Sequence, residues 1–543
     1  MKHMTERENM TEQEKYDVVI VGGGPVGLGL AIELGQRGVR VGVVERYTEP
    51  QPVPKGQNLT QRTMEHFHAW EAEAELRAAR TVPKGHGIGG LTCYGTVLSD
   101  YHYDWLQRDL VRQYYFTENE RLPQYATEAV LRARAARIPQ ITVHYGWSGV
   151  GFTQDDSGVS VEIEARDDRA RKTLRGSYLA GCDGSRSLVR EQAGISEDRR
   201  DHDKKMVLLV FRSTELHDLL ERYPDKQFYN ALHPDLEGYW MFFGRVDLGS
   251  TWFFHAPVPM DTTEDNFDFK AYLHRAVGAE FAVDLDYVGF WDLRFAIANS
   301  YRAGRVFIAG DAAHSHPPYG GFGINSGFED ARNLGWKLAA HLEGWAGPEL
   351  LDSYDAERRP VFVSTSRDFI ENFIEEDAEF LATHSPEKDR AAFEAAWQAR
   401  AVGARDEVNA FEPNYRGSPV TVGGAAGSPS AVGAHSFEAR AGHHLPPQEL
   451  SDGRNVFEAL GRGFTLLALD APEAAVAAFE KAAAATGIPL TVVRDTRRDG
   501  REAWKAAMIL VRPDEFIAWT GEDAEDAEAI LRHAAGRRQD VSR

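Results

Sequence analysis

The sequence predicts an α/β protein built from several domains, and three observations lead to this prediction. The chain has 543 residues, which at about 150 residues per domain corresponds to three or four domains. Near the N-terminus, a glycine-rich turn connects an apolar strand to a helix, and a second apolar strand follows. Residues 205–295 instead carry alternating, aromatic-rich runs that are typical of an antiparallel sheet. A parallel sheet with helices and a separate antiparallel sheet account for both patterns.

Composition limits the partners and the location of the protein. The formal net charge is −22, and the field of such a chain repels phosphate, so we expect neither a nucleic-acid nor a membrane partner. Two cysteines, Cys93 and Cys182, build neither a disulfide framework nor a four-cysteine metal site, and no metal site is expected. No apolar run approaches the roughly 20 residues of a membrane span. Residues 1–15 lack the apolar stretch of a signal peptide, so we expect a disordered leader on a cytoplasmic protein.

The first ordered elements form a βαβ unit. Residues 16–21 are apolar and β-branched, as in a buried parallel strand, and residues 25–37 have the pattern of an amphipathic helix. Residues 39–45 repeat the strand pattern. The unit is therefore expected to open a nucleotide-binding domain.

The turn of this unit carries a dinucleotide fingerprint. Gly22 permits the tight turn, Gly24 lets backbone approach a pyrophosphate, and Gly27 allows close packing of helix and strand. The helix N-terminus offers unpaired N–H groups to phosphate. Glu45 ends the second strand, where its carboxylate can accept from both ribose hydroxyls and would repel a 2′-phosphate. These features alone do not separate FAD from NAD.

The remaining elements follow in chain order. The patterns predict helices at 60–80, 124–136, 323–342, 360–381 and 386–410, short strands within 139–182, and a buried strand at 305–310. The Gly-, Ser-, Ala- and Pro-rich residues 413–435 are typical of a linker. Beyond the linker, the patterns predict strands at 464–469, 490–494, 508–511 and 516–519, and helices at 472–484 and 523–534.

The segment 304–337 favours a flavin over NAD. Asp311 ends a buried strand, where its carboxylate could accept a hydrogen bond from a ribityl hydroxyl. Prolines 317 and 318 with Gly320 and Gly321 make a rigid loop whose backbone can lie close to a flat ring. The helix that starts near Gly323 would point its N-terminus at that ring and stabilise negative charge on a reduced flavin.

Three motifs carry a resemblance to a known family. Residues 304–337 resemble the GD fingerprint of the class A flavoprotein monooxygenases, the FAD-dependent aromatic hydroxylases. Residues 181–190 (GCDGSRSLVR) resemble the DG motif of that family, and residues 351–360 (LDSYDAERRP) resemble the segment that usually follows. Order and spacing agree over residues 16–375.

The resemblance implies noncovalently bound FAD, reduced by NADPH or NADH without a separate domain for that cosubstrate. It implies contacts to the ADP half from the fingerprint turn, Glu45 and Arg46, to the pyrophosphate from Gln124, and to the ribityl chain from Asp311. Asp183 and Arg186 are associated with FAD binding and NAD(P)H use, whereas Arg62 matches an Arg-x-x-Glu helix in which a structural ion pair is an equal alternative. The full set of expected FAD contacts is Gly22, Gly24, Pro25, Val26, Gly27, Glu45, Arg46, Arg62, Gln124, Asp183, Arg186, Asp311, Pro318, Gly321, Gly323, Ile324 and Asn325.

The resemblance also implies the reaction. O2 would add to the reduced flavin at C4a to give a hydroperoxide, and an electron-rich ring, typically a phenolate, would attack its distal oxygen. The substrate pocket is expected between the flavin loop and the aromatic sheet. No residue stands in a motif for catalysis, so the base is unknown; polar candidates on the sheet are His255, Tyr239, Tyr229, Arg212 and Arg294. His314, near the flavin loop, is expected to support loop geometry.

The domain plan follows from these assignments. Residues 16–190 and 296–380 form a Rossmann-type FAD-binding domain, residues 191–295 an inserted antiparallel substrate domain, and residues 381–435 a helical connector with the linker. Residues 436–543 resemble the thioredoxin-like C-terminal domain of phenol hydroxylase. No cysteine lies beyond Cys182, so thiol redox chemistry is excluded there. A packing or dimer role is left, and a homodimer is expected.

Alternative functions stay open at this point. The ring could be a single phenol or a fused-ring aromatic polyketide of an antibiotic pathway, since a wide aromatic sheet suits either. The βαβ unit alone also fits an NAD-dependent Rossmann dehydrogenase, although this leaves the Asp311 segment unexplained. A nonenzymatic flavoprotein is a further alternative, and the Trp-x-Trp segment of flavin-dependent halogenases is missing.

Overall fold

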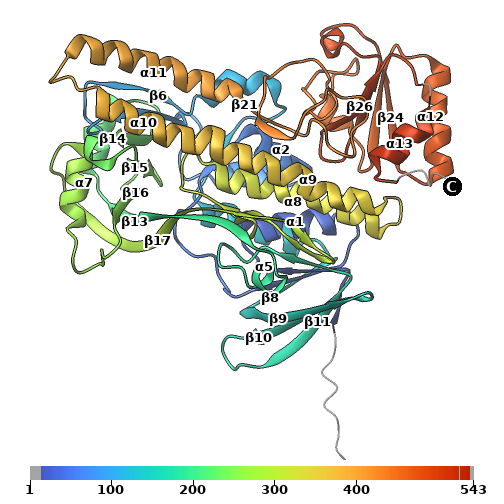
Figure 1. The fold of residues 1–543 in the computed structure, drawn as a ribbon, viewed down its shortest axis with the longest axis horizontal. Coiled ribbons are helices and arrows are strands. Elements are labelled where there is room, and N and C mark those ends of the chain that lie inside the picture. Colours follow the sequence, from blue (N-terminus) through green and yellow to red (C-terminus); the bar gives the residue numbers. More distant parts are fainter. Residues whose placement is uncertain (1–13, 525, 538–543) are drawn as a thin grey trace, which may run out of the picture.

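A computed structural model describes residues 14–524 and 526–537 (Figure 1). It contains a nucleotide-binding domain, an eight-stranded sheet beside it, and long helices that run across both. The C-terminal domain lies at one end of these helices. Residues 1–13, which make up most of the expected leader, lie outside the described part of the chain.

The nucleotide-binding domain is built on a six-stranded sheet. Its strands are ordered β18(Arg302–Ala303), β19(Val306–Ile308), β12(Tyr178–Gly181), β2(Val18–Val21), β3(Val41–Glu45) and β8(Ile141–Tyr145). All neighbours run parallel except β18 and β19, and β2, β3, β12 and β19 are buried throughout. One face is covered by helices, chiefly α1(Pro25–Gly35), α4(Gln124–Ala136) and α8(Phe322–Leu342). The expected βαβ unit is confirmed, and α4 has the predicted bounds.

A four-stranded sheet covers the other face of the parallel sheet. It is formed by β1(Glu14–Lys15), β11(Arg171–Gly176), β10(Gly158–Ala165) and β9(Trp147–Asp155). Two residues of the predicted leader are therefore ordered. They pair in parallel with β11, and Glu14 forms an ion pair with Lys172 at 2.8 Å, which explains why the chain is already fixed at this point.

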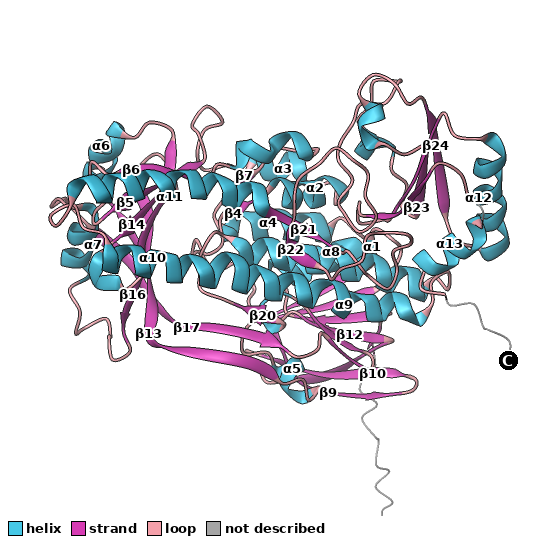
Figure 2. Cartoon of the chain, turned by 45° about the horizontal axis from the view of Figure 1, so that its top comes forward, coloured by secondary structure: helices cyan, strands magenta, loops and turns pink. Residues whose placement is uncertain are grey.

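The eight-stranded sheet is larger than residues 205–295 predict. Its order is β20(His314–Ser315), β17(Asp284–Ala298), β13(Glu197–Arg212), β16(Thr251–Pro259), β15(Trp240–Arg245), β14(Lys226–Leu232), β5(Gly89–Tyr94) and β6(His102–Trp105). Long strands β13 and β17 connect it to the nucleotide-binding domain (Figure 2). The strands from residues 205–295 pair antiparallel, as predicted. The sheet also takes in β5 from the first part of the chain, and β5 runs parallel to β14.

One face of this sheet forms its own core. Helices α6(Glu215–Leu219) and α7(Phe269–Val277) belong to the sheet's segment, and α7 packs apolar residues such as Leu273 against the sheet residues Phe254 and Tyr229. The opposite face carries Asn230, Phe242 and His255, which alternate with those core residues along the strands. That second face is turned toward α10(Asn372–Thr383) and α11(Arg390–Ala410).

The segment between the helices and the C-terminal domain is packed. Helix α9(Pro348–Ser364) continues through a π-helix at Thr365–Glu371 into α10. After α11, β21(Phe411–Asn414) and β22(Ser430–Val432) pair with each other inside residues 413–435. Tyr415, Val420 and Ala431 are fully buried there. The segment predicted as a linker is therefore packed against the rest of the structure, because buried apolar residues among its glycines anchor it.

The C-terminal domain has the topology that the resemblance implies. Its sheet is ordered β24(Leu490–Asp495), β23(Phe464–Leu469), β25(Met508–Val511) and β26(Ile517–Gly521), flanked by α12(Glu473–Thr486) and α13(Ala527–Ala534). Strands β23 and β24 are parallel, and β25 and β26 are antiparallel to their neighbours. This is a thioredoxin-like arrangement. Its apolar core continues into Trp336 and Trp345 of the nucleotide-binding domain.

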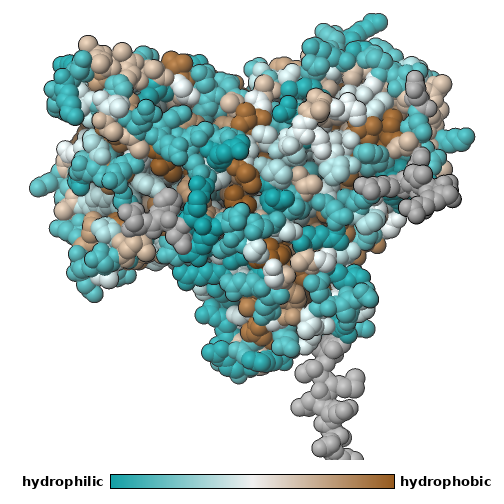
Figure 3. All heavy atoms as spheres, in the orientation of Figure 1, coloured by the Kyte–Doolittle hydropathy of each residue, from teal (hydrophilic) through white to brown (hydrophobic). Residues whose placement is uncertain are grey.

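Further helices and strands complete the described chain: α2(Gln61–Ala69), α3(Glu73–Ala78), α5(Leu188–Gln192), β4(Asn58–Leu59) and β7(Glu120–Arg121). On the face shown in Figure 3, apolar side chains form small separate groups among hydrophilic ones. In the described residues, every helix is too short or too polar to cross a bilayer.

Candidate active site

The fingerprint turn, the DG motif and the GD segment converge at the C-terminal edge of the parallel sheet. A Cβ on Gly22 would lie 2.2 Å from the carbonyl oxygen of Cys182, so the fingerprint turn and the DG motif are in direct contact. The Arg190 guanidinium donates to the carbonyl of Ala312 at 3.1 Å, which ties the DG motif to the GD segment. Val26 packs against Gly310 on the third side. Segments from three distant parts of the chain thus surround one place.

The fingerprint glycines serve different purposes, as predicted. Gly22 has φ +104° and Gly27 lies so close to Gly22 that a Cβ would be 1.9 Å from its carbonyl oxygen. Both positions need glycine for folding. Gly24 differs, because its φ is −73° and a Cβ there would meet no atom within 4 Å. The space beside Gly24 is open, and no side chain caps the N-terminus of α1 next to it. This is where a pyrophosphate fits.

Glu45 contacts the fingerprint turn, and Gln124 lies at the start of α4. Glu45 is buried, and its two carboxylate oxygens accept from the backbone N–H of Gly23 and of Tyr47, each at 2.8 Å. The side-chain carbonyl of Gln124 accepts from the N–H of Gly56 at 3.2 Å. Each carboxylate oxygen can accept a second bond, so ribose hydroxyls remain possible partners. Arg46 is exposed at the end of β3.

Asp311 lies in the short turn that follows strand β19. Its side chain is exposed, and the surrounding protein raises its pKa by desolvation, against the opposing effects of His314, Lys55 and Arg294. The adjoining loop has Gly320 at φ +64° and Gly321 at φ +70°, and α8 begins after it without a side-chain cap. These residues fit the ribityl chain and ring of FAD.

His314 and Asp330 hold the segment around Asp311 in place. His314 is buried and contacts Asp330 at 2.7 Å, while its ring stacks on Phe362 at 3.8 Å. Asp330 also accepts from Arg358 of the LDSYDAERRP motif at 2.8 Å. This network holds the GD segment on α8 and α9, which agrees with the predicted supporting role of His314.

The DG-motif residues differ in their surroundings. Asp183 accepts from the Ser187 hydroxyl at 2.5 Å and from the backbone N–H of Val189 at 3.2 Å, so it fixes the start of α5, and burial raises its pKa. Arg186 is largely exposed and approaches Asp292 at 3.6 Å. Arg294 donates to the carbonyl of Ser185 at 2.7 Å. It therefore positions the DG loop.

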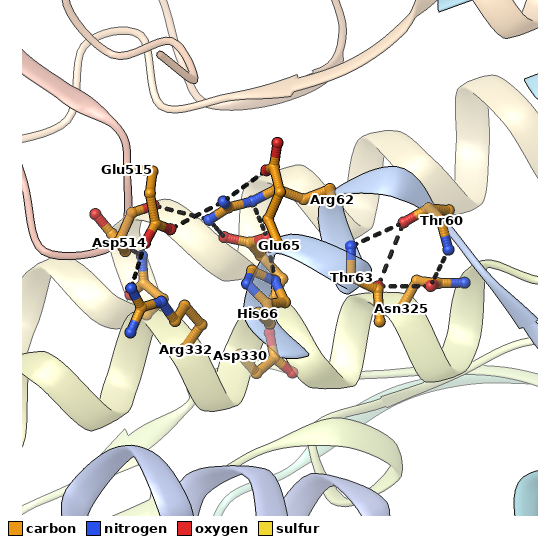
Figure 4. A network of polar contacts seen from close by, with 12 residues as sticks. Thr60, Arg62, Thr63, Glu65, His66, Asn325, Asp330, Arg332, Asp514 and Glu515 are labelled. Carbon is orange, nitrogen blue, oxygen red and sulfur yellow. Dashed lines mark hydrogen bonds and ion pairs between the residues drawn. The ribbon is translucent and has the colours of Figure 1, made fainter. Parts of the chain in front are cut away.

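The structure favours the structural alternative for Arg62. All three nitrogens of its guanidinium are engaged by the carboxylates of Glu65, Glu329 and Glu515 and by the carbonyl of Asp514 (Figure 4). Asn325, one turn into α8, donates to the carbonyls of Asn58 and Gly321 and accepts from Thr60 and Thr63. These contacts join α2, α8 and the C-terminal domain.

A pocket of about 370 Å³ lies between the eight-stranded sheet and helices α10 and α11. We call it the sheet–helix pocket. One wall comes from β5, β6 and β14, the other from α10, α11 and the π-helix, and the flavin loop contributes Tyr319. Its volume is in the range of small-molecule sites. The lining residues used below are Asn230, Tyr319, Glu376, Asp377, Arg400 and Glu407.

The sheet candidates from the sequence are mostly placed elsewhere. Tyr229 faces the opposite core and donates to the carbonyl of Lys226 at 2.8 Å. Arg212 is exposed and pairs with Asp286 at 3.1 Å. Tyr239 stacks on Trp240 at the start of β15. His255 lies on the pocket side of the sheet, but burial among aromatic rings lowers its pKa to about 3, so it stays neutral.

The pocket residues on α10 and α11 were missed by sequence analysis. Asp377 pairs with Arg400, and burial raises the pKa of Asp377 to about 7. Glu407, on α11, also lines the pocket. Helix α11 had been assigned to a connector and most of α10 to the FAD-binding domain, since a charged residue on an amphipathic helix gives no signal that its face closes a pocket.

Comparisons with known proteins agree with this site. The profile of the family described as "FAD binding domain" matches residues 15–367, and that of "Aromatic-ring hydroxylase, C-terminal" matches residues 438–538. The chain is 32% identical to 4-methyl-5-nitrocatechol 5-monooxygenase of Burkholderia sp, over 95% of this chain and 96% of that protein. It is 29% identical to tetracenomycin A2 monooxygenase-dioxygenase of Streptomyces glaucescens, over 96% of this chain and 97% of that protein.

Solved structures are similar along nearly the whole chain. The rebeccamycin biosynthetic enzyme RebC with reduced flavin matches with a TM-score of 0.84 at 28% identity, covering 97% of this chain and 100% of that one. Aklavinone-11 hydroxylase in complex with FAD and aklavinone matches with a TM-score of 0.79 at 27% identity, over 97% and 100%. The NAD-dependent dehydrogenase that the βαβ unit left open gains no support.

The fold, the convergence of the fingerprint turn with the DG and GD segments, and the two family matches lead to one conclusion. The chain belongs to the FAD-dependent aromatic-ring hydroxylases, and it is an FAD-dependent aromatic monooxygenase.

Proposed function

We propose that this monooxygenase hydroxylates a phenolic ring that binds in the sheet–helix pocket, with NADPH or NADH as reductant. The observation that carries the proposal is that Tyr319, in the loop expected to lie against the flavin ring, also lines the pocket. A ring bound there is next to the cofactor loop. Bound FAD would supply the activation of O2, and the protein supplies positioning and exclusion of water.

The chain's own residues have separate tasks in this proposal. Asp311, Glu45, Gln124 and the α1 N-terminus bind the cofactor. Aromatic residues such as Trp105 and Phe373 line the pocket and keep water from the ring. A single-ring phenol and a fused-ring polyketide are both compatible with this lining. The similarity to enzymes named for a nitrocatechol and for aklavinone supports testing both classes.

The decisive experiment uses labelled oxygen. Purified holoenzyme is incubated with NADH or NADPH, 18O2 and a panel of phenols and fused-ring polyketides. We expect at least one ring compound to accelerate NAD(P)H oxidation and to gain one labelled oxygen, read by mass spectrometry. Stoichiometric hydrogen peroxide with no labelled product from any compound would contradict hydroxylation as the native reaction. The homodimer expected from the sequence stays a prediction.

The open space at Gly24 gives a specific prediction. Gly24→Val should leave the folded apoprotein as stable as the wild type, because a Cβ there meets no atom of the described residues within 4 Å, but should block FAD binding. Gly27→Ala is the matched comparison and should lower both stability and FAD binding, because its Cβ collides with Gly22. Thermal unfolding of the apoproteins and FAD titration separate the two effects. An equally destabilised Gly24→Val apoprotein would show that this space is needed for folding.

A further inference from the structure

Glu407 is a pocket carboxylate without a partner. It lies on α11 and lines the sheet–helix pocket. Within the residues that the structure describes, its carboxylate makes no side-chain hydrogen bond and no ion pair, whereas Asp377 in the same pocket is paired with Arg400. A partly buried carboxylate of this kind is free to accept a proton or a hydrogen bond from a ligand.

A second, independent observation indicates a polar ligand in the same space. Asn230, on β14 in the opposite wall, is 98% buried, being only 2% exposed. Its side-chain carbonyl oxygen is buried without a hydrogen-bond partner in the described structure. An unpaired buried amide costs free energy that a ligand hydroxyl would recover. Asn230 and Glu407 therefore present two acceptors to one pocket that is otherwise rich in aromatic rings.

Charged groups around Glu407 set its protonation. Burial raises the pKa of Glu407 to about 8, Arg108 opposes this, and Asp377 and Glu376 on α10 add to it. Several titratable or charged groups face the pocket: Arg108 from the 3₁₀ turn before Tyr115, Tyr103 from β6, Tyr319 from the flavin loop, Asp368 from the π-helix, Glu376 and Asp377 from α10, and Arg400 and Asp406 from α11. Arg108 is 8% exposed, and its Nε has no partner among the described residues.

We propose that Glu407 is the general base that removes the proton from the phenolic hydroxyl of the substrate, and that the side-chain carbonyl of Asn230 accepts a hydrogen bond from a second hydroxyl of the same ring. This rests on the proposed function. The O–H bond of the phenol breaks, the proton passes to a Glu407 carboxylate oxygen, and the electron pair stays on the ring oxygen. The resulting phenolate is the electron-rich form that hydroxylation requires. The proton leaves to solvent after the reaction.

The pH dependence gives the test its direction. Only the ionised form of Glu407 can accept a proton, so the fraction of active base rises as pH passes about 8. In a Glu407→Gln variant this limb is lost, and the rate rises only toward the pKa of the phenol itself, about 10 for an unsubstituted ring. A nitrophenol already ionised in the assay buffer needs no base.

The experiment measures labelled product in a single turnover, mixing prereduced holoenzyme with 18O2 and either an unsubstituted phenol or an ionised nitrophenol. For Glu407→Gln we expect a loss of about 100-fold with the phenol, no limb near pH 8, and a rate with the nitrophenol close to the wild type. Glu379→Gln, an exposed residue of α10 outside the pocket, is the matched control and should follow the wild-type profile. Asn230→Ala should raise KM for a dihydroxylated ring more than for either of these monophenols.

The outcomes separate the two proposals. If wild-type enzyme hydroxylates both compounds and Glu407→Gln keeps the wild-type pH profile with the phenol, Glu407 is not the base while the proposed function stands. Equal losses with phenol and nitrophenol would assign Glu407 a merely structural role and would also overturn the inference. If the wild type labels neither compound nor any polyketide, the proposed function itself fails.

Discussion

Asp311→Ala is expected to yield a colourless protein. The variant would lack the carboxylate that we expect to accept a hydrogen bond from the ribityl chain. A hydrogen bond to a charged group is worth about 1.5–3 kcal/mol, which corresponds to roughly 10- to 100-fold weaker FAD binding. Because the surrounding protein raises the pKa of Asp311, the site already disfavours the bare charge, and the apoprotein should lose no stability. The ratio of flavin to protein absorbance after purification reads the occupancy.

The control for this variant removes a carboxylate outside the GD segment. Asp286→Ala deletes an exposed partner of Arg212 at the far end of β13, and it should retain FAD fully. Apoprotein unfolding temperatures of both variants, measured without FAD, show whether the chain still folds. Wild-type flavin content in Asp311→Ala would mean that the GD segment does not hold the cofactor.

Glu357→Gln is expected to cause the largest loss of stability. Glu357 is fully buried in α9, and Arg512 and Lys337 contact its carboxylate at 2.6 Å. These two cations outweigh burial and hold the pKa of Glu357 below its usual range, while burial lowers the pKa of Lys337 to about 8. Neutralising the carboxylate leaves two buried cations with Asp514 alone, and breaking a buried pair costs about 3–5 kcal/mol.

The urea midpoint of unfolding measures this loss. Asp452→Asn is the matched control, because its ion pair with Arg454 is exposed to solvent and should contribute little to stability. An unchanged midpoint for Glu357→Gln would show that the three charges do not depend on one another.

Sequence reasoning succeeded where the physics is local. The βαβ unit was found because a strand, a glycine turn and a helix follow one another, and each glycine's conformation is fixed by its immediate neighbours. The bounds of α4 were found because Gln124 follows a proline that ends the preceding segment. Asp311 was found because its position at the end of a buried strand is itself a local pattern.

The rest depends on partners far along the chain. Asn230 and Glu407 have no sequence relationship, and only the folding of α11 across the sheet brings them to one pocket. Strand β5 was missed because its partner β14 lies more than a hundred residues later. Arg62 remained ambiguous because its carboxylate Glu515 belongs to the C-terminal domain.

The charged contacts across the C-terminal domain restrict how such chains can recombine. Arg332 on α8 forms an ion pair with Glu515 of the C-terminal domain, and Arg512 of that domain forms one with Glu357 on α9. The C-terminal domain and the nucleotide-binding domain therefore each supply charges that the other neutralises. A chimaera that took its last hundred residues from a distant homologue would bury unmatched ions unless the complementary residues were transplanted together. We therefore expect the C-terminal domain to be exchangeable between such proteins only together with the residues of α8 and α9 that pair with it.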